Sequence, residues 1–289
     1  MKRLLPLSIL LLTACHNAHE AIIPEATDAT TVSIRVMGDF RTKHEDMTRT
    51  ATPLGEDNTA ALTDLWLLDY DGDGSLLQQL HQSDTEDADF GNPDITLTYG
   101  QHNIAIIASK GDNPTLADTD LSWTKVKDTH TTILPLTVGA STATTITAEL
   151  QRAITCLTII NSDTIPANAA TLTITISARY NALSLPSLTA LADDAGSWTN
   201  TFTLTATNAG VTGIRFNTYT LCPSNDTFTL DATITTTATD GTTISTFTIS
   251  GIELLRNRKT ILTGPVFDRT SGFTISIDDV WDTSLDLTF

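Results

Sequence analysis

The sequence predicts an all-β protein built of two tandem β-sandwich domains. Threonine makes up about a fifth of the 289 residues, and its β-branched side chain suits a half-exposed pleated sheet. Many of the threonines alternate with apolar residues, the period of two that is typical of a strand with one solvent face. A threonine-rich stalk that carries glycans is the alternative, but such stalks are rich in proline and lack alternating apolar partners.

The number of domains follows from the length. Many short strands at fairly regular spacing are typical of sandwiches, and one sandwich needs about 100 residues. We therefore expect an N-terminal β-sandwich over residues 31–150 and a C-terminal β-sandwich over residues 151–289. No long amphipathic helix is expected, although a short one near residues 76–81 is an alternative to strand there.

The segment before these domains has the parts of a bacterial lipoprotein signal. A basic start precedes an apolar run from Leu4 to Leu12, and Cys15 follows a small residue, which is the lipobox pattern. Spanning a bilayer takes about 20 apolar residues, so the run is too short for a membrane helix. We predict a signal peptide at 1–14, an acylated Cys15 and a tether over 15–30. A plain secretory signal is the alternative.

The N-terminal domain begins with a strand whose apolar side chains alternate with polar ones: Val32, Ile34, Val36 and Phe40. The segment 41–58 is polar and charged and contains Pro53 and Gly55, so we expect an exposed loop there. Further strands are predicted at 62–70, 95–99, 102–109, 131–138 and 144–150.

The C-terminal domain shows the same alternation of apolar and polar residues. Its strands are predicted at 151–160, 172–178, 202–206, 215–221, 228–234, 247–249, 259–262, 273–277 and 280–289.

The segment Asp69–Gly74 matches the opening of a calcium-binding loop, D-x-[DN]-x-[DN]-G. The twelfth position of such a loop is a bidentate Glu, and here it is Leu80. We therefore predict a hairpin turn, because an Asp-Gly pair between extended segments favours one. A loosely held surface calcium is the alternative.

Composition and motifs argue against several classes of function. A net charge of −18 would repel the phosphates of nucleic acid. The six histidines are scattered, and no metal-ligand spacing, nucleophile elbow, P-loop or dinucleotide fingerprint occurs. We expect a protein that is not an enzyme and needs no cofactor.

Cysteines and tryptophans leave alternatives open. Cys156 and Cys222 could pair in an oxidising compartment or remain two buried thiols. Trp123 and Trp198, in polar surroundings, are candidates for a face that stacks on sugars, whereas the other two tryptophans lie in apolar strands and are expected in the core.

Several segments, in this order, resemble the fimbrillin-like fimbrial subunits of Bacteroides-type bacteria, including their anchor subunits, whose polymers are called type V pili. Each motif alone is weak, and the likeness lies in the order in which the motifs follow one another along nearly the whole chain. They are the lipobox, Thr48-Arg49-Thr50, residues 65–70 before the Asp-Gly turn, 100–108, Leu150-Gln151-Arg152-Ala153, 219–224, 256–260 and the closing strand from 273 to Trp281.

The resemblance implies two transthyretin-like (Greek-key) β-sandwiches, export as a lipoprotein and assembly by donor-strand exchange. In structural subunits of that family an arginine-specific protease removes the first strand, and a neighbour's strand fills the vacated groove. The matching cut here would follow Arg49, with Arg41 as a second site. The alternative is that both arginines are solvated loop residues.

The end of the sequence has the pattern that a donor strand needs. Apolar residues alternate to the last position: Trp281, Leu285, Leu287 and Phe289. A strand at a free terminus leaves its own domain at little cost, and it can restore both a ladder and a core elsewhere. An ordinary final strand in its own sheet is the alternative.

The predicted function is therefore a fimbrial subunit or anchor lipoprotein that supports adhesion. We expect it at the cell outer membrane, surface-exposed and held in the lipid through Cys15. Its predicted partners are other fimbrial subunits and a host glycan or protein, and not nucleic acid. The alternative is a monomeric surface glycan-binding lipoprotein, and an exported hydrolase is a third reading.

Overall fold

The computed structural model describes residues 28–38, 40, 52–54, 62–117, 119–223, 227–268 and 272–278. Its regular structure consists of strands and one 3-10 turn, with no α-helix in these ranges, so the all-β prediction is confirmed. No helix of this part of the chain is long and apolar enough to cross a membrane. Cys15, Arg41, Arg49 and the predicted donor residues Trp281, Leu285, Leu287 and Phe289 lie outside the described residues.

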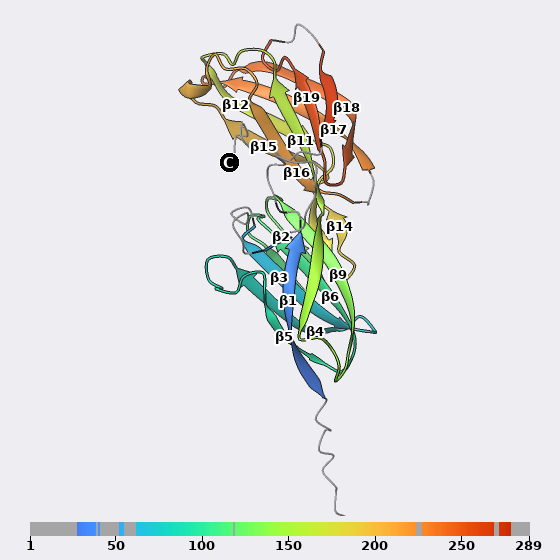
Figure 1. Ribbon diagram of the computed structural model, residues 1–289. Helices are drawn as coiled ribbons and strands as arrows, with labels where there is room; N and C mark the ends of the chain where they lie inside the picture. The colour runs from blue at the N-terminus through green and yellow to red at the C-terminus, as the bar shows by residue number, and fades with distance from the viewer. Residues whose placement is uncertain are drawn as a thin grey trace, which may run out of the picture.

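The strands up to residue 152 make the lower half of the molecule in Figure 1, here called the N-terminal half. Its strand order is β2-β1-β10-β9-β6-β3-β4, and β5 pairs with the first five residues of β1. β9 and β10 pair at only two positions, Gln151 with Thr131 and Arg152 with His130, so the sheet folds there into two layers. The strands are β1 (Ala29–Gly38), β2 (Thr52–Pro53), β3 (Asp64–Asp71), β4 (Leu76–Ser83), β5 (Asp94–Thr98), β6 (Gly100–Ser109), β9 (Thr129–Val138) and β10 (Thr145–Arg152).

The strands from residue 154 onward make most of the upper half, the C-terminal half (Figure 1). One sheet has the order β16-β11-β19-β20 and the other β15-β12-β17-β18. The strands are β11 (Ile154–Asn161), β12 (Ala169–Ile176), β15 (Trp198–Thr203), β16 (Arg215–Leu221), β17 (Thr227–Ala238), β18 (Thr243–Leu255), β19 (Lys259–Gly264) and β20 (Thr274–Asp278).

Each half has its own apolar core between two layers. In the N-terminal half the core contains Val32, Leu65, Ile104 and Leu150. In the C-terminal half it contains Leu157, Ile174, Ile234 and Phe247. Alternate residues of each strand enter these cores, as the period of two in the sequence requires.

The two halves have the same topology. In each, the first strand pairs in parallel with a late strand, β1 with β10 and β11 with β19. The opposite layers read β4-β3-β6-β9 and β15-β12-β17-β18, with corresponding strands in the same order along the chain. The sequence shows no strict repeat, because this topology needs only the alternation of apolar residues and not particular side chains.

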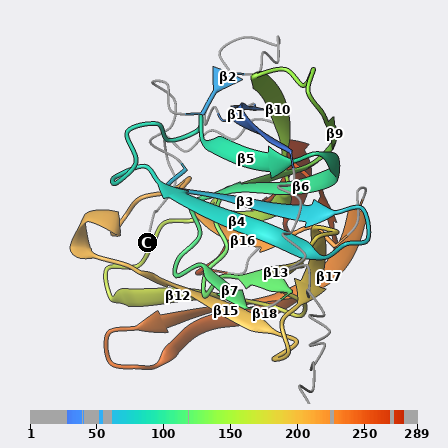
Figure 2. The same ribbon diagram turned by 90° about the horizontal axis from the view of Figure 1, so that it is seen from below.

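A small sheet joins the halves, seen around β7 and β13 in Figure 2. Its order is β14-β13-β8-β7, so each half contributes one hairpin: β7 (Thr115–Ala117) with β8 (Asp120–Ser122), and β13 (Tyr180–Ser184) with β14 (Thr189–Ala192). Side chains of both halves, among them Leu68 and Ile107 with Ile154 and Leu183, form a third apolar cluster beneath it. The division at residue 150 into separate domains stays a prediction.

The threonines account for the solvent face of one sheet. Three rows of four run across β15, β12, β17 and β18, and hydroxyls of neighbouring strands bond each other, as in Thr235–Thr246 at 2.9 Å. The residues between them point into the core. The rows are Thr203-Thr171-Thr237-Thr243, Thr201-Thr173-Thr235-Thr246 and Thr199-Thr175-Thr233-Thr248.

Candidate functional site

β1 is the strand on which the core of the N-terminal half depends. It pairs in parallel with β10 from Ser33–Thr145 to Gly38–Leu150, and its other edge pairs with β5 and β2. Its apolar side chains have no exposed surface: Val32, Ile34, Val36 and, just beyond it, Phe40. β1 is thus an inner strand of its layer, with a ladder on both edges.

The opposite face of β1 is open to solvent. Thr31 and Arg35 are exposed, and the Ser33 hydroxyl donates to the carboxylate of Asp94 on β5. Burial of each large apolar side chain contributes roughly 1.5–3 kcal/mol, so the four buried residues contribute roughly 6–12 kcal/mol together. That amount is comparable with the whole stability of many domains, about 5–15 kcal/mol. Without β1, this layer would therefore need another strand in its place.

The corresponding strand of the C-terminal half, β11, is held much more firmly. Seven of its eight residues are buried, since Leu157 and Ile159 face one core while Ile154 and Cys156 face the cluster between the halves. Only Ala153 separates β11 from β10. β11 is therefore held by its one-residue link to β10 and by packing on both faces, whereas β1 is packed on one face only.

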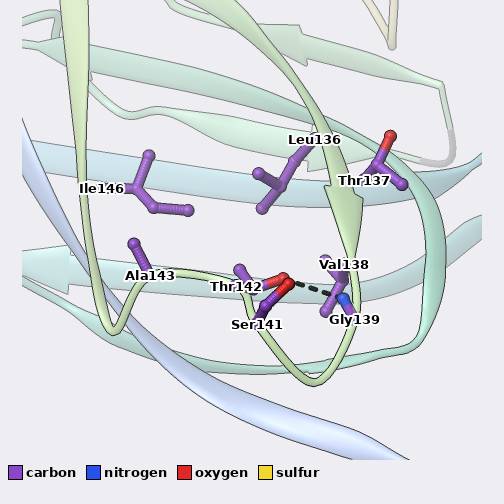
Figure 3. A pocket seen from close by; sticks show the side chains of 8 residues that line it. All are labelled: Leu136, Thr137, Val138, Gly139, Ser141, Thr142, Ala143 and Ile146. Atoms are coloured by element: carbon purple, nitrogen blue, oxygen red, sulfur yellow. Dashed lines mark hydrogen bonds between the residues drawn. The ribbon is translucent and has the colours of Figure 1, made fainter.

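β10 has an open edge beside a shallow groove, shown in Figure 3. Over residues 145–150 β10 pairs only with β1 among the described strands. The groove has a volume of about 500 Å³ and separates β10 from β9. Leu136 and Ile146 face each other across it (Figure 3), and the loop at its end is closed by a bond from the Gly139 N–H to the Thr142 hydroxyl, 2.8 Å.

In the C-terminal half the matching edge of β19 is occupied by β20. β20 lies on the surface, with Ile275 62% and Ile277 51% exposed. An open strand edge next to apolar side chains is a template for strand addition. Among the described strands of the N-terminal half, none covers the open edge of β10 as β20 covers the edge of β19 in the C-terminal half.

A charged cluster fixes the junction of the halves. Arg152 donates to both oxygens of Asp128, from Nε at 2.7 Å and from a terminal nitrogen at 2.9 Å, and also to Asn257 of the C-terminal half at 3.3 Å. His130 Nε2 lies 3.2 Å from Asp128. Burial raises the pKa of the Asp128 carboxyl, but the charges and hydrogen bonds of Arg152 and His130 outweigh it and hold that pKa well below its usual range.

The tryptophans proposed for sugar stacking are not on open surfaces. Trp123 is only 2% exposed and belongs to the cluster between the halves, so its assignment to a sugar-binding face is wrong. Trp198 is partly buried against the C-terminal core, and the Arg179 guanidinium lies 4.5 Å from its ring centre. Trp66, expected in the core, stacks on His81 at 4.0 Å.

Cys156 and Cys222 do not form a disulfide in the described structure. Cys156 is paired with Tyr219 across β11 and β16, three residues before Cys222. At about 3.3 Å per residue this offset is about 10 Å, whereas disulfide-bonded Cα atoms lie within about 7 Å. The pairing of these cysteines is therefore excluded by strand register.

The predicted Asp-Gly hairpin is confirmed. β3 and β4 pair around it, the Asp71 carboxylate accepts from the N–H groups of Asp73 and Ser75 at 2.9 and 2.8 Å, and Gly74 has a φ of 84°. The short helix considered near residues 76–81 is instead β4, because pairing with β3 outweighs the weak local helix preference. No group of metal-ligating side chains occurs among the described residues.

Comparison with known proteins identifies the family of the chain. Residues 87–288 match the model of a family of unknown function, DUF6562, and the chain belongs to that family. No curated protein sequence matches it.

Solved structures share the fold at low identity. A Bacteroides thetaiotaomicron structure described as "putative polysaccharide binding proteins (DUF1812)" is 12% identical, with 86% of this chain and 96% of that chain covered and a TM-score of 0.55. A "putative adhesin" of the same organism is 13% identical, with 88% and 98% covered and a TM-score of 0.53.

The fimbrial anchor protein Mfa2 of Porphyromonas gingivalis is 12% identical, with 86% and 96% covered and a TM-score of 0.49. A likeness at that score is too weak to support a functional conclusion. The first two structures show that the chain shares their fold.

Proposed function

We propose that this protein is a subunit or anchor of a surface fimbria that assembles by strand exchange and supports adhesion. Lipid on Cys15 would hold it in the outer membrane. The observation that carries the proposal is the position of β1. It is an early strand with a ladder on both edges and three fully buried apolar side chains, followed by the buried Phe40, and it precedes the segment with Arg41 and Arg49.

In this proposal β1 is both needed and replaceable. Its removal would open the second edge of β10 and a trough lined by the core of the N-terminal half, and an incoming strand would restore both. The last residues of a second copy have the alternation that such a strand requires. An anchor would keep β1, whereas a shaft subunit would lose it after cleavage at Arg49 or Arg41.

Assembly and anchoring are tested on the full-length protein in its own envelope. Deleting Thr283–Phe289 should leave a folded monomer that no longer joins polymers, since this part carries the donor pattern. Ser250→Ala, at an exposed position within β18, is the control variant. Normal polymers from the deletion variant would refute strand donation by this end.

N-terminal sequencing of surface material separates the two roles. A start at Cys15 indicates an anchor, and a start at Thr50 indicates a shaft subunit. Cys15→Ala should release the protein from membranes. Retention of that variant in the membrane fraction would contradict lipid anchoring without bearing on strand exchange.

A further inference from the structure

A polar groove of about 510 Å³ lies on the N-terminal half, away from β1. It lies between the start of β3, the segment after β6 and the segment before β9. Its lining combines cations, carboxylates, an amide and hydroxyls: Thr63, Asp64, Lys110, Asp112, Asn113, Thr124 and Lys127, with Gly111 and Pro114.

Hydrogen bonds hold the walls of this groove in place. The Asp112 N–H donates to the Lys125 carbonyl at 2.9 Å, and the Thr124 N–H donates to the Asp112 carbonyl at 3.1 Å. The Asn113 amide donates to the Thr124 hydroxyl at 3.1 Å. From the C-terminal half, Arg179 donates to the Thr124 carbonyl at 2.6 Å. The groove is therefore preorganised, which lowers the entropy lost on binding.

The groove is also where positive charge gathers on an acidic chain. The protein has a net charge of −18 and six lysines, and three of these lie between residues 110 and 127: Lys110, Lys125 and Lys127. Lys127 is 2.6 Å from Asp112. Burial lowers the pKa of Lys125, and the nearby charge of Lys127 lowers it further while Asp112 acts against both.

The carboxylates of the groove already accept bonds from neighbouring side chains, and a carboxylate has about four lone-pair sites in all. The Asp112 side chain is 42% exposed. Asp64 is bonded to the Thr63 hydroxyl at 2.7 Å and to His81 Nε2 at 2.9 Å. His81, 38% exposed, stacks on Trp66, so a flat ring surface lies next to the Asp64 end of the groove.

We propose that this groove binds a saccharide that carries a carboxylate. Lys110 and Lys127 match the carboxylate. Sugar hydroxyls, which both donate and accept, match the carboxylates of Asp64 and Asp112 and the neutral side chains of Asn113 and Thr124. The groove combines positive, negative and neutral polar side chains. Such a lining suits a ligand with one carboxylate and several hydroxyls better than a ligand whose groups all carry the same charge. This inference rests on the adhesive role proposed above and names its ligand class.

The test uses the purified full-length monomer and two probes that differ only at C6, methyl glucuronide with a carboxylate and methyl glucoside with a hydroxymethyl group. Amide NMR shifts should move at Gly111 and Asn113, and the glucuronide should bind at least about tenfold more tightly, because charge-assisted hydrogen bonds contribute more than neutral ones. Added salt should weaken the glucuronide binding alone. N-acetylglutamate amide, a carboxylate without the sugar hydroxyls, should bind more weakly.

Lys110→Gln combined with Lys127→Gln should abolish the preference for the glucuronide, while Arg35→Gln, an exposed cation on β1, should leave it unchanged. Thermal unfolding confirms that each variant is folded. Equal binding of the two glycosides, equal binding of the glutamate probe, no shifts at the groove amides, or a preference that survives in the double lysine variant would each overturn the proposal. Because the monomer is used, these outcomes are independent of polymer formation.

Discussion

The two halves share one topology but differ in how their first strand is held. β11 is buried on both faces and is joined to β10 through a single residue, whereas β1 is buried on one face and precedes a long polar segment. The C-terminal half also covers the edge of its last inner strand with β20, and the corresponding edge of β10 is open over residues 145–150. The same architecture can thus serve as a closed module in one half and as an acceptor of strands in the other.

The solvent faces differ as well. In the C-terminal half, the rows of threonines leave an uncharged, hydrogen-bonded surface. In the N-terminal half the outer face of β3 and β6 is covered by the cluster between the halves, which includes Leu68, Tyr70 and Ile107. Contact between the halves therefore covers the outer face of β3 and β6 in the N-terminal half and one face of β11 in the C-terminal half.

The largest effect is expected from deleting residues 28–40. The loss of roughly 6–12 kcal/mol of apolar burial should unfold the N-terminal half while β11, β17 and β19 stay protected. Hydrogen exchange measured by mass spectrometry resolves the halves. Protection that persists across β3, β6 and β9 would contradict the role given to β1.

Asp128→Ala should break the junction between the halves. It leaves the Arg152 side chain, which is 3% exposed, without its carboxylate, and loss of one partner of a buried pair costs about 3 kcal/mol or more. Urea unfolding measures the change. Asn257→Ala removes the 3.3 Å contact with Arg152 at a residue whose φ of 56° is less favourable for alanine than for asparagine. It is the milder variant and should cost about 1–2 kcal/mol.

Acidification tests the same carboxylate. The pKa of Asp128 is lower in the folded than in the unfolded protein, so the unfolded chain takes up more protons as the pH falls. The stability contributed by Asp128 is complete above about pH 4–5 and is lost below it. Asp128→Asn should therefore flatten this part of the stability–pH curve. An unchanged slope would show that other groups determine acid unfolding.

Gly91→Ala should loosen β1 in its layer without removing it. Gly91 has a φ of 87°, and an added Cβ would meet the backbone of Leu54, while its carbonyl accepts the Val36 N–H at 2.9 Å. A left-handed conformation at a non-glycine residue costs of order 1–3 kcal/mol. Exchange of the β1 amides should accelerate more than that of β11. Gly196→Ala is the control, because Gly196 also has a positive φ of 70° but an added Cβ would meet no other atom. It measures the cost of the backbone conformation without a steric clash.

Thr235→Val is expected to have the smallest effect. It removes the 2.9 Å hydroxyl contact with Thr246 on a surface where valine suits a strand equally well. The free energy of unfolding should change by less than about 0.5 kcal/mol. A loss above 1 kcal/mol would mean that the threonine rows stabilise the C-terminal half rather than only solvate it.

Alternation of apolar residues was sufficient to predict most strands, including β1 with its three core residues and Phe40 after it, and the Asp-Gly pair predicted the hairpin at Asp71. It could not give the pairing of β13 with β8, because such contacts depend on how two distant hairpins meet. Trp123 has polar neighbours in sequence yet is buried between the halves for the same reason. Register alone separates Cys156 from Cys222, and sequence does not specify register between distant strands.

The groove at Lys110 and Lys127 and the cluster at Asp128 were not predicted from sequence. Their residues belong to segments before and after short strands, and only the closing of β9 against β6 brings them together. The enrichment of lysine between residues 110 and 127 was the available signal for the groove. No comparable signal marks Asp128, whose partner Arg152 is 24 residues away.

The replaceability of β1 can be measured directly. The full-length protein is cut with an arginine-specific protease and incubated with an isotope-labelled synthetic peptide of residues 273–289, and native mass spectrometry follows the bound species. We predict that the fragment carrying β1 leaves and that one peptide takes its place, restoring exchange protection in β10. A fragment that stays bound through repeated cycles of peptide addition, with no peptide taken up, would contradict the account.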